Sequence, residues 1–248
     1  MAVIDPDLLL RAYSIGVFPM ADSRDAGEIF WVEPRRRAII PLDGLRLSRS
    51  LRKSIRSGAF RVTRDAAFPQ VVRHCAERTE TWINRDIEDS YIRLHRMNHA
   101  HSIECWHDET LVGGLYGVTL GAAFFGESMF SIMPDASKVA LAWLVARLKV
   151  GGYRLLDCQF MTEHLRSLGA IEIDQKSYVT LLSAALSAGA AEGDGASGDG
   201  VAASGGAASP PPAVEFGALD RLLEADPART VDGPASGCVI LQLLGQTS

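Results

Sequence analysis

The sequence lacks several short motifs that identify common enzyme sites. It has no G-x-x-x-x-G-K-[ST] segment, which excludes a phosphate-binding loop of that type. It has no G-x-S-x-G elbow, and Ser128 and Ser131 have no evident His and Asp partners, which argues against a serine triad. The four cysteines are dispersed without a C-x-x-C pair, which argues against a zinc ribbon and a disulfide framework.

Long hydrophobic runs are also absent. The most apolar stretch with helical spacing, residues 139–146, is too short to cross a bilayer. The first residues do not combine a basic segment with a following apolar one, so they do not resemble a secretory signal. We therefore expect a cytoplasmic protein with no membrane partner. The hydrophobic content of 47% is typical of a globular chain.

The net charge of −5 hides an uneven distribution. Residues 1–186 carry 23 Lys and Arg against 22 Asp and Glu, whereas residues 187–248 carry 2 against 8. Within the first hundred residues the balance is 17 against 13. The basic N-terminal half leaves room for a local surface that attracts a polyanion, since local fields steer such partners more than net charge does.

The hydrophobic pattern predicts an α+β protein with a mixed sheet. Helices are predicted over residues 7–15, 47–55, 67–76, 87–97, 137–149, 163–168 and 176–186, and strands over 102–106, 110–119, 122–131 and 153–160. Residues 187–213 are rich in Ala, Gly and Ser and end in three prolines, which predicts a disordered linker. After the linker we expect a short helix from Phe216 and a buried strand over residues 238–244.

Two segments carry candidate chemistry. Glu127 lies in the apolar run AAFFGESMFSIM, where an unpaired carboxylate would cost about 2–7 kcal/mol to bury. Asp157 and Gln159 are two residues apart on a predicted strand, so we expect them on one face, where the carboxylate could orient the amide. An exposed edge residue and a solvated sheet face are the alternatives at these two places.

Basic and imidazole side chains form two further clusters. Arg49, Lys53 and Arg56 fall on one face of a predicted helix, which fits either a solvated surface or contact with phosphates. The second cluster comprises His95, His99 and His101. No nearby residue completes a convincing set of ligands, so we expect no metal.

Seven segments together resemble one family. They are LLLRAYSIGVFPMAD (8–22), FWVEPRRRAIIP (30–41), LRLSRSLRKSIR (45–56), ETWINRDIEDSYIRLHRMNHAHSIECW (80–106), LVGGLYGV (111–118), FFGESMFSIMPDASKVAL (124–141) and LLDCQFMTEHLRSLGAIEI (155–173). In order and in sequence they resemble the bacterial leucyl/phenylalanyl-tRNA–protein transferases. The combination of G-E-S-M-F-S, D-C-Q and HAHSIE is specific.

The resemblance implies a fold and an activity. It implies a small N-terminal domain over residues 1–35, a GNAT-like transferase domain over 36–186, and a return of residues 214–248 to that domain. The implied reaction moves Leu or Phe, and less readily Met, from aminoacyl-tRNA to proteins that begin with Arg or Lys. Such products are marked for degradation by the N-degron route. No cofactor is implied, and nothing in the sequence requires more than a monomer.

The resemblance also assigns residues. The active-site group falls on Asp157, Gln159 and Glu127; the aminoacyl pocket on Leu115, Phe124, Met129 and Leu144; the 3′-adenosine and entrance positions on Tyr13, Met20 and Trp82; and the tRNA-binding cluster on Arg49, Lys53 and Arg56. Met20 and Leu144 replace aromatic residues of the family pattern, and Ser57 replaces a cation of the cluster.

Two other functions stay open at this point. One is a related transferase that acylates a different acceptor, such as a cell-wall peptide. The other is a tRNA-binding module without catalysis. For the transferase, we expect Asp157 to orient Gln159 so that its carbonyl oxygen accepts a hydrogen bond from the attacking amine.

Overall fold

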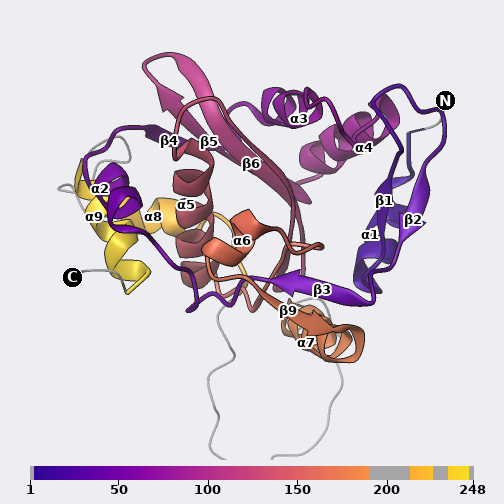
Figure 1. Cartoon of the computed structure of the whole chain (residues 1–248). Helices are drawn as coiled ribbons and strands as arrows, with labels where there is room; N and C mark the ends of the chain where they lie inside the picture. Colours follow the sequence, from indigo (N-terminus) through magenta and orange to yellow (C-terminus); the bar gives the residue numbers. More distant parts are fainter. Residues whose placement is uncertain (1–2, 190–212, 226–233, 246–248) are drawn as a thin grey trace, which may run out of the picture.

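The computed structural model describes residues 3–189, 213–225 and 234–245. A seven-stranded sheet forms its centre, and a two-stranded ribbon lies near one end of that sheet (Figure 1). The ribbon pairs β1 (Phe18–Met20) with β2 (Phe30–Val32), and α1 (Pro6–Ser14) packs beside it. The linker predicted over residues 187–213 falls mainly on 190–212, which lie outside the described residues.

The large sheet is mixed. Its strands are β3 (Arg36–Ile39), β4 (Arg61–Arg64), β5 (Ala100–His107), β6 (Thr110–Leu120), β7 (Ala123–Ser131), β8 (Leu155–Asp157) and β9 (Ile171–Asp174), in the spatial order β4-β5-β6-β7-β8-β3-β9. Neighbouring strands are antiparallel except β7 and β8, which run parallel. This confirms the predicted α+β class with a small N-terminal domain and a mixed sheet.

Helices cover both faces of the sheet. They are α2 (Arg49–Arg56), α3 (Phe68–Ala76), α4 (Arg85–Arg96), α5 (Ala136–Val150), α6 (Glu163–Ser167), α7 (Gln175–Gly189), α8 (Ala218–Glu224) and α9 (Pro234–Leu243). One apolar core lies under α1, α3, α4 and α7, and the other under α5 with α2, α8 and α9. Most side chains of α5 are buried, as a helix that is apolar nearly all round requires.

A β-bulge interrupts the pairing of β6 with β7. Tyr116 pairs with Ser128 and Gly117 pairs with Gly126, so Glu127 is the extra residue between them. A bulge turns the side chains beside it in a new direction. The carboxylate thus enters this apolar strand where the regular alternation of faces is broken.

The bulge also changes which residues face each helix layer. Glu127 contacts tyrosines of α1 and α4, whereas Met129 packs against the core under α5. In an unbroken strand these two side chains would share a face. The bulge therefore lets one strand supply a carboxylate to one layer and an apolar wall to the other.

Two predicted strands are corrected. The strand expected over residues 153–160 ends at Asp157, and Gln159 has a left-handed φ of 57°. The expectation that Asp157 and Gln159 share a strand face is therefore wrong. The Asp157 carboxylate accepts a hydrogen bond from the Gln159 backbone N–H at 2.8 Å, and this local turn ends the strand.

The strand expected over residues 238–244 is replaced by the helix α9, which includes residues 238–243. A short apolar run fits either a strand or a buried helix by periodicity alone. Here the run packs against α2 and α5, and Gly237 lies against the backbone of Ile55, where a side chain would overlap it. The helical surface offered by α2 and α5 decides the conformation, which the run itself leaves open.

Candidate active site

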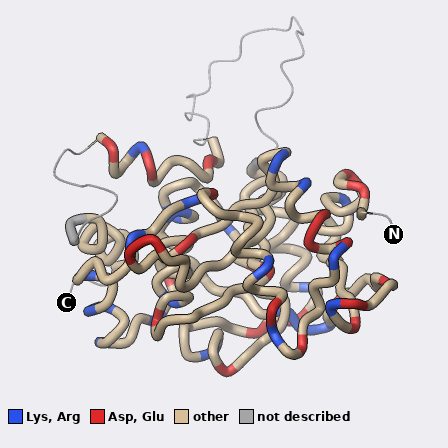
Figure 2. Tube along the Cα trace, turned by 90° about the horizontal axis from the view of Figure 1, so that it is seen from above, with Lys and Arg blue, Asp and Glu red and all other residues tan. Residues whose placement is uncertain are grey.

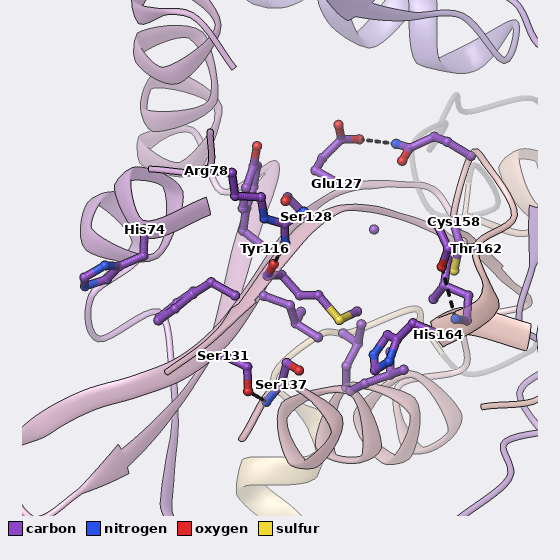
Figure 3. Close-up of a pocket in the computed structure, with 18 of the residues that line it drawn as sticks. His74, Arg78, Tyr116, Glu127, Ser128, Ser131, Ser137, Cys158, Thr162 and His164 are labelled. Carbon is purple, nitrogen blue, oxygen red and sulfur yellow. Dashed lines mark hydrogen bonds between the residues drawn. The ribbon is translucent and has the colours of Figure 1, made fainter. Parts of the chain in front are cut away.

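A cavity of about 800 Å³ opens between β7, the end of β8 and the helices α5 and α6 (Figure 3). Part of its wall is apolar and comprises Leu115, Met129, Leu141, Leu144, Leu156 and Leu165. Its polar wall includes Glu127, Gln159, Tyr116, Trp82 and Arg78. An apolar pocket with a few converging polar groups is the usual form of a small-ligand site.

The structure brings most of the predicted pocket residues together. Leu115, Met129 and Leu144 line the cavity. Phe124 does not: its ring is fully buried in the core and stacks on Phe216 at 5.6 Å. Cys158 lines the cavity without having been predicted to do so.

Glu127 is buried among neutral hydrogen-bond donors. The Tyr13 hydroxyl donates to Glu127 Oε1 at 2.8 Å, and the Tyr91 hydroxyl donates to Oε2 at 2.7 Å. The Gln159 side chain donates from Nε2 to Oε1 at 2.8 Å, the dashed contact beside Glu127 in Figure 3. The carboxylate therefore orients the Gln159 amide, a role that the sequence had assigned to Asp157.

The amide oxygen of Gln159 is the atom that can act on a ligand. Because Nε2 points at Glu127, Oε1 is turned to the other side of the amide, and it has no partner within the described part of the chain. Gln159 is 6% exposed and lines the cavity. An acceptor oxygen fixed on the wall of a cavity can receive an N–H of a ligand.

Asp157 holds the backbone beneath that amide. It accepts hydrogen bonds from the Gln159 N–H and from the Tyr178 hydroxyl, the latter at 2.8 Å. Arg37 forms a two-pronged ion pair with Asp157, with Nη2 2.6 Å from Oδ2 and Nε 2.9 Å from Oδ1. The Arg37 guanidinium also lies between the rings of Phe18 and Tyr178.

Burial controls the protonation of this site. Desolvation raises the pKa of Glu127 to about 7, although hydrogen bonds from the two tyrosines and the field of Arg37 oppose the shift. Burial also raises the pKa values of Tyr13 and Tyr91 well above the ordinary range, so both hydroxyls stay protonated. The carboxyl group of Glu127 therefore changes charge near neutral pH.

The predicted entrance residues lie at different depths. Trp82 lines the cavity, whereas Tyr13 lies behind Glu127 and is fully buried. Met20 is half-buried in β1 and does not line the cavity. The sequence analysis identified neither Tyr91 nor Arg37 as a site residue. Arg37 directly precedes the apolar residues 38–40, and this position is the signal that could have indicated its burial.

The basic helix lies away from this network. Arg49, Lys53 and Arg56 are exposed on α2, on the side opposite the buried Leu51 and Ile55. In Figure 2 the Lys and Arg positions are spread over the molecule, and several of them lie near the C-terminal end of the chain. The helix α2 packs on α9. The predicted common face is thus present and open to a ligand.

The predicted histidine cluster serves other contacts. His101 Nδ1 lies 2.9 Å from Asp65 Oδ2, and the His95 ring stacks on Phe68 at 4.2 Å. Within residues 3–189, 213–225 and 234–245, no three His, Cys, Asp or Glu side chains are grouped to hold a metal ion. Over the same ranges, no helix combines the length and apolarity that a membrane span requires.

Comparison with known proteins decides the family. The profile of the leucyl/phenylalanyl-tRNA protein transferase matches residues 39–183, and that of its N-terminal domain matches residues 3–35. A leucyl/phenylalanyl-tRNA–protein transferase of Rhizorhabdus wittichii is 63% identical over 252 aligned residues, which cover 100% of both chains. This chain belongs to the leucyl/phenylalanyl-tRNA–protein transferase family.

Other transferases of this family align with about three quarters of this chain. Those of Zymomonas mobilis and Novosphingobium aromaticivorans are 60% and 61% identical, over 75% and 73% of this chain and 71% of their own length in each case. The bulge, the cavity and the hydrogen-bonded group around Glu127 are therefore features of a member of the transferase family.

Proposed function

We propose that this cavity transfers Leu or Phe, and less readily Met, from aminoacyl-tRNA to the α-amino group of proteins that begin with Arg or Lys. The modified proteins are then marked for degradation by the N-degron route, in the cytoplasm, and the enzyme acts as a monomer without a cofactor. Membership of the transferase family supports the reaction. The observation that carries the assignment of the site is the apolar pocket that ends at the free oxygen of Gln159.

The mechanism rests on positioning. The aminoacyl ester is already activated, so the enzyme has to hold an amine against its carbonyl carbon. Such positioning contributes up to about 7–11 kcal/mol in favourable intramolecular reactions. In our proposal Gln159 Oε1 accepts a hydrogen bond from the amine, Glu127 fixes the amide, and Asp157 fixes its backbone.

The apolar wall selects the transferred side chain. Leu, Phe and Met have a single substituent at Cβ and fill a deep pocket, whereas Ile and Val are branched there. Met129 is flexible and adapts its shape to several ligands. A missing methylene costs only about 1–3 kcal/mol, which agrees with some transfer of Met.

The tRNA body would bind through charge. Trp82 at the cavity offers a ring for the 3′-terminal adenine. Arg49, Lys53 and Arg56 offer three exposed cations on one helix. Each phosphate that such a cation neutralises strengthens binding in a manner that weakens with salt.

One assay tests the function against its alternatives. Labelled Leu-tRNA is mixed with a protein that starts with Arg, with and without acyl-CoA thioesters. Transfer to the Arg terminus without CoA supports the proposal. Acylation only from CoA, or only of another amine, favours the related acyltransferase, and binding without transfer favours a tRNA-binding module.

A variant tests the role of the amide. Gln159→Ala should lower the single-turnover rate by about 10²-fold or more, because the oriented acceptor is lost, while binding of aminoacyl-tRNA persists. Glu163→Gln on exposed α6 is the control and should transfer at the normal rate. An unchanged rate in Gln159→Ala would remove this residue from the mechanism.

A further inference from the structure

We propose that Glu127, together with the hydroxyl groups of Tyr13 and Tyr91, is the proton acceptor of the transfer reaction. Glu127 takes a proton from the α-ammonium group of the acceptor protein and so releases the neutral amine. This inference rests on the proposed function. It identifies the group that accepts the proton from the α-ammonium group.

Three oxygen-bearing groups form a closed ring. Tyr13 lies 2.8 Å from Glu127 Oε1, Tyr91 lies 2.7 Å from Oε2, and the two hydroxyl oxygens lie 2.7 Å apart. Each of these distances is that of an O–H···O hydrogen bond. Tyr13 and Tyr91 are fully buried and Glu127 is 7% exposed, so little water reaches these three groups.

Counting protons shows that the ring has room for one more. The ring has three O···O contacts, but when Glu127 is ionised only the two tyrosine hydroxyl protons are available to fill them. Both of these protons point at the carboxylate. The contact between Tyr13 and Tyr91 then has no proton. A proton on Glu127 Oε2 completes a cycle in which Oε2 donates to Tyr91, Tyr91 donates to Tyr13, and Tyr13 donates to Oε1.

Only the Tyr91 hydroxyl proton has to turn, from Glu127 toward Tyr13, when this proton arrives, and the other contacts stay in place. Glu127 Oε1 still accepts from Gln159 Nε2 in both states, so the amide keeps its orientation. The described residues place no Lys, Arg or His within ion-pair distance of Glu127, so no cation fixes the carboxylate in its charged form. A buried carboxylate without a cation, on the wall of a cavity, accepts a proton readily.

The reaction needs such an acceptor. The α-ammonium group of a protein has a pKa of about 7.7–8.0 and is mostly protonated at neutral pH, but only the neutral amine attacks. Glu127 takes one proton from the ammonium group. The amine nitrogen then bonds to the ester carbon, the bond to the ribose oxygen breaks, the second proton passes to that oxygen, and Glu127 releases its proton to solvent.

Charged and titratable groups from five elements face Glu127. They are Tyr13 of α1, Tyr91 of α4, Tyr116 of β6, Arg37 of β3 and Asp157 of β8. Burial, and to a smaller extent the charge of Asp157, raise the pKa of Glu127, whereas Tyr91, Tyr13 and Arg37 lower it. The net result is a pKa of about 7. As a base Glu127 acts when ionised, so activity is present above pH 7 and is lost as the pH falls through that value.

The test measures which group controls the pH profile. Single-turnover transfer of Leu from Leu-tRNA is followed from about pH 5 to pH 9 with two peptides, one starting Arg-Asp and one starting Arg-Lys, whose α-amino pKa values differ through the neighbouring charge. We expect one inflection near pH 7, common to both peptides. Tyr91→Phe should move it up by about one pH unit, because it removes a hydrogen bond that favours the ionised carboxylate.

Further variants keep the inference falsifiable. Tyr13→Phe should move the inflection in the same direction, and Glu127→Gln should remove it and slow transfer about 10²-fold or more. Tyr153 is a buried tyrosine in the core under α5. Tyr153→Phe is therefore the matched control and should leave the pH profile of transfer unchanged. An inflection that follows the peptide and stays in place in Tyr91→Phe would overturn the inference while leaving the proposed function intact, whereas no transfer by the unmodified enzyme would overturn both.

Discussion

Replacement of Arg37 by Leu should destabilise this protein far more than the same change one residue earlier. The Arg37 guanidinium is 1% exposed and pairs with Asp157, which is fully buried. It also donates to the Gly16 carbonyl at 2.9 Å, which ties the N-terminal segment to the sheet. Removing one partner of a buried ion pair leaves a charge without compensation and costs about 3–5 kcal/mol.

The neighbouring Arg36 provides the control. It pairs with Glu172, but its side chain is 63% exposed, and such surface pairs contribute at most about 1 kcal/mol. We expect Arg36→Leu to change the free energy of unfolding by no more than that. Urea denaturation followed by tryptophan fluorescence measures both variants under one set of conditions.

A double variant separates stability from activity. Arg37→Leu combined with Asp157→Leu removes both charges and should recover much of the stability that the single variant lacks. Transfer should stay impaired, because the Gln159 N–H no longer has its acceptor. A destabilisation in Arg37→Leu that equals that in Arg36→Leu, or a double variant no more stable than Arg37→Leu, would refute this account.

Three further predictions concern the pocket, the basic helix and the bulge. Leu115→Trp should fill the pocket and lower transfer of Phe more than transfer of Leu in a competition assay, and equal reductions would count against the pocket assignment. Replacing Arg49, Lys53 and Arg56 by Gln should weaken tRNA binding and flatten its salt dependence by a slope of about 1 for each phosphate that is no longer neutralised; an unchanged slope would exclude this face. Gly117→Ala should cost about 1–3 kcal/mol of unfolding free energy, because its methyl group would overlap the neighbouring strand at the bulge, and a neutral result in a urea melt would contradict that packing.

Local patterns predicted much of the fold because the physics that they report is local. Ser48 caps α2 as its position before an apolar-periodic run predicts, and Gly169 adopts the left-handed conformation that ends a helix. For Glu127 the apolar run left two possibilities, an exposed edge residue or a paired carboxylate, and the structure shows it buried and paired. The family was recognised from motifs, and the profiles confirm it.

The failures occurred where neighbours in space decide. Residues 238–244 are apolar enough for a strand, but α2 and α5 pack against this segment and residues 238–243 are helical. Asp157 and Gln159 have strand spacing, but the side chain of the first binds the backbone of the second and turns the chain. In both cases the free energy that favours the observed conformation comes from a contact that the hydrophobic periodicity of the sequence does not reveal.

The amino-acid sequence by itself determined the family, the class of fold and the position of a lone carboxylate within an apolar segment. Only the tertiary structure decided how it is paired. Tyr13 and Tyr91 are 78 positions apart, and each is far from Glu127 along the chain, so their ring exists only because α1 and α4 pack over the bulge in β7. A proton site of this kind depends on O–H···O distances of 2.7 to 2.8 Å between groups on separate elements, and packing sets those distances.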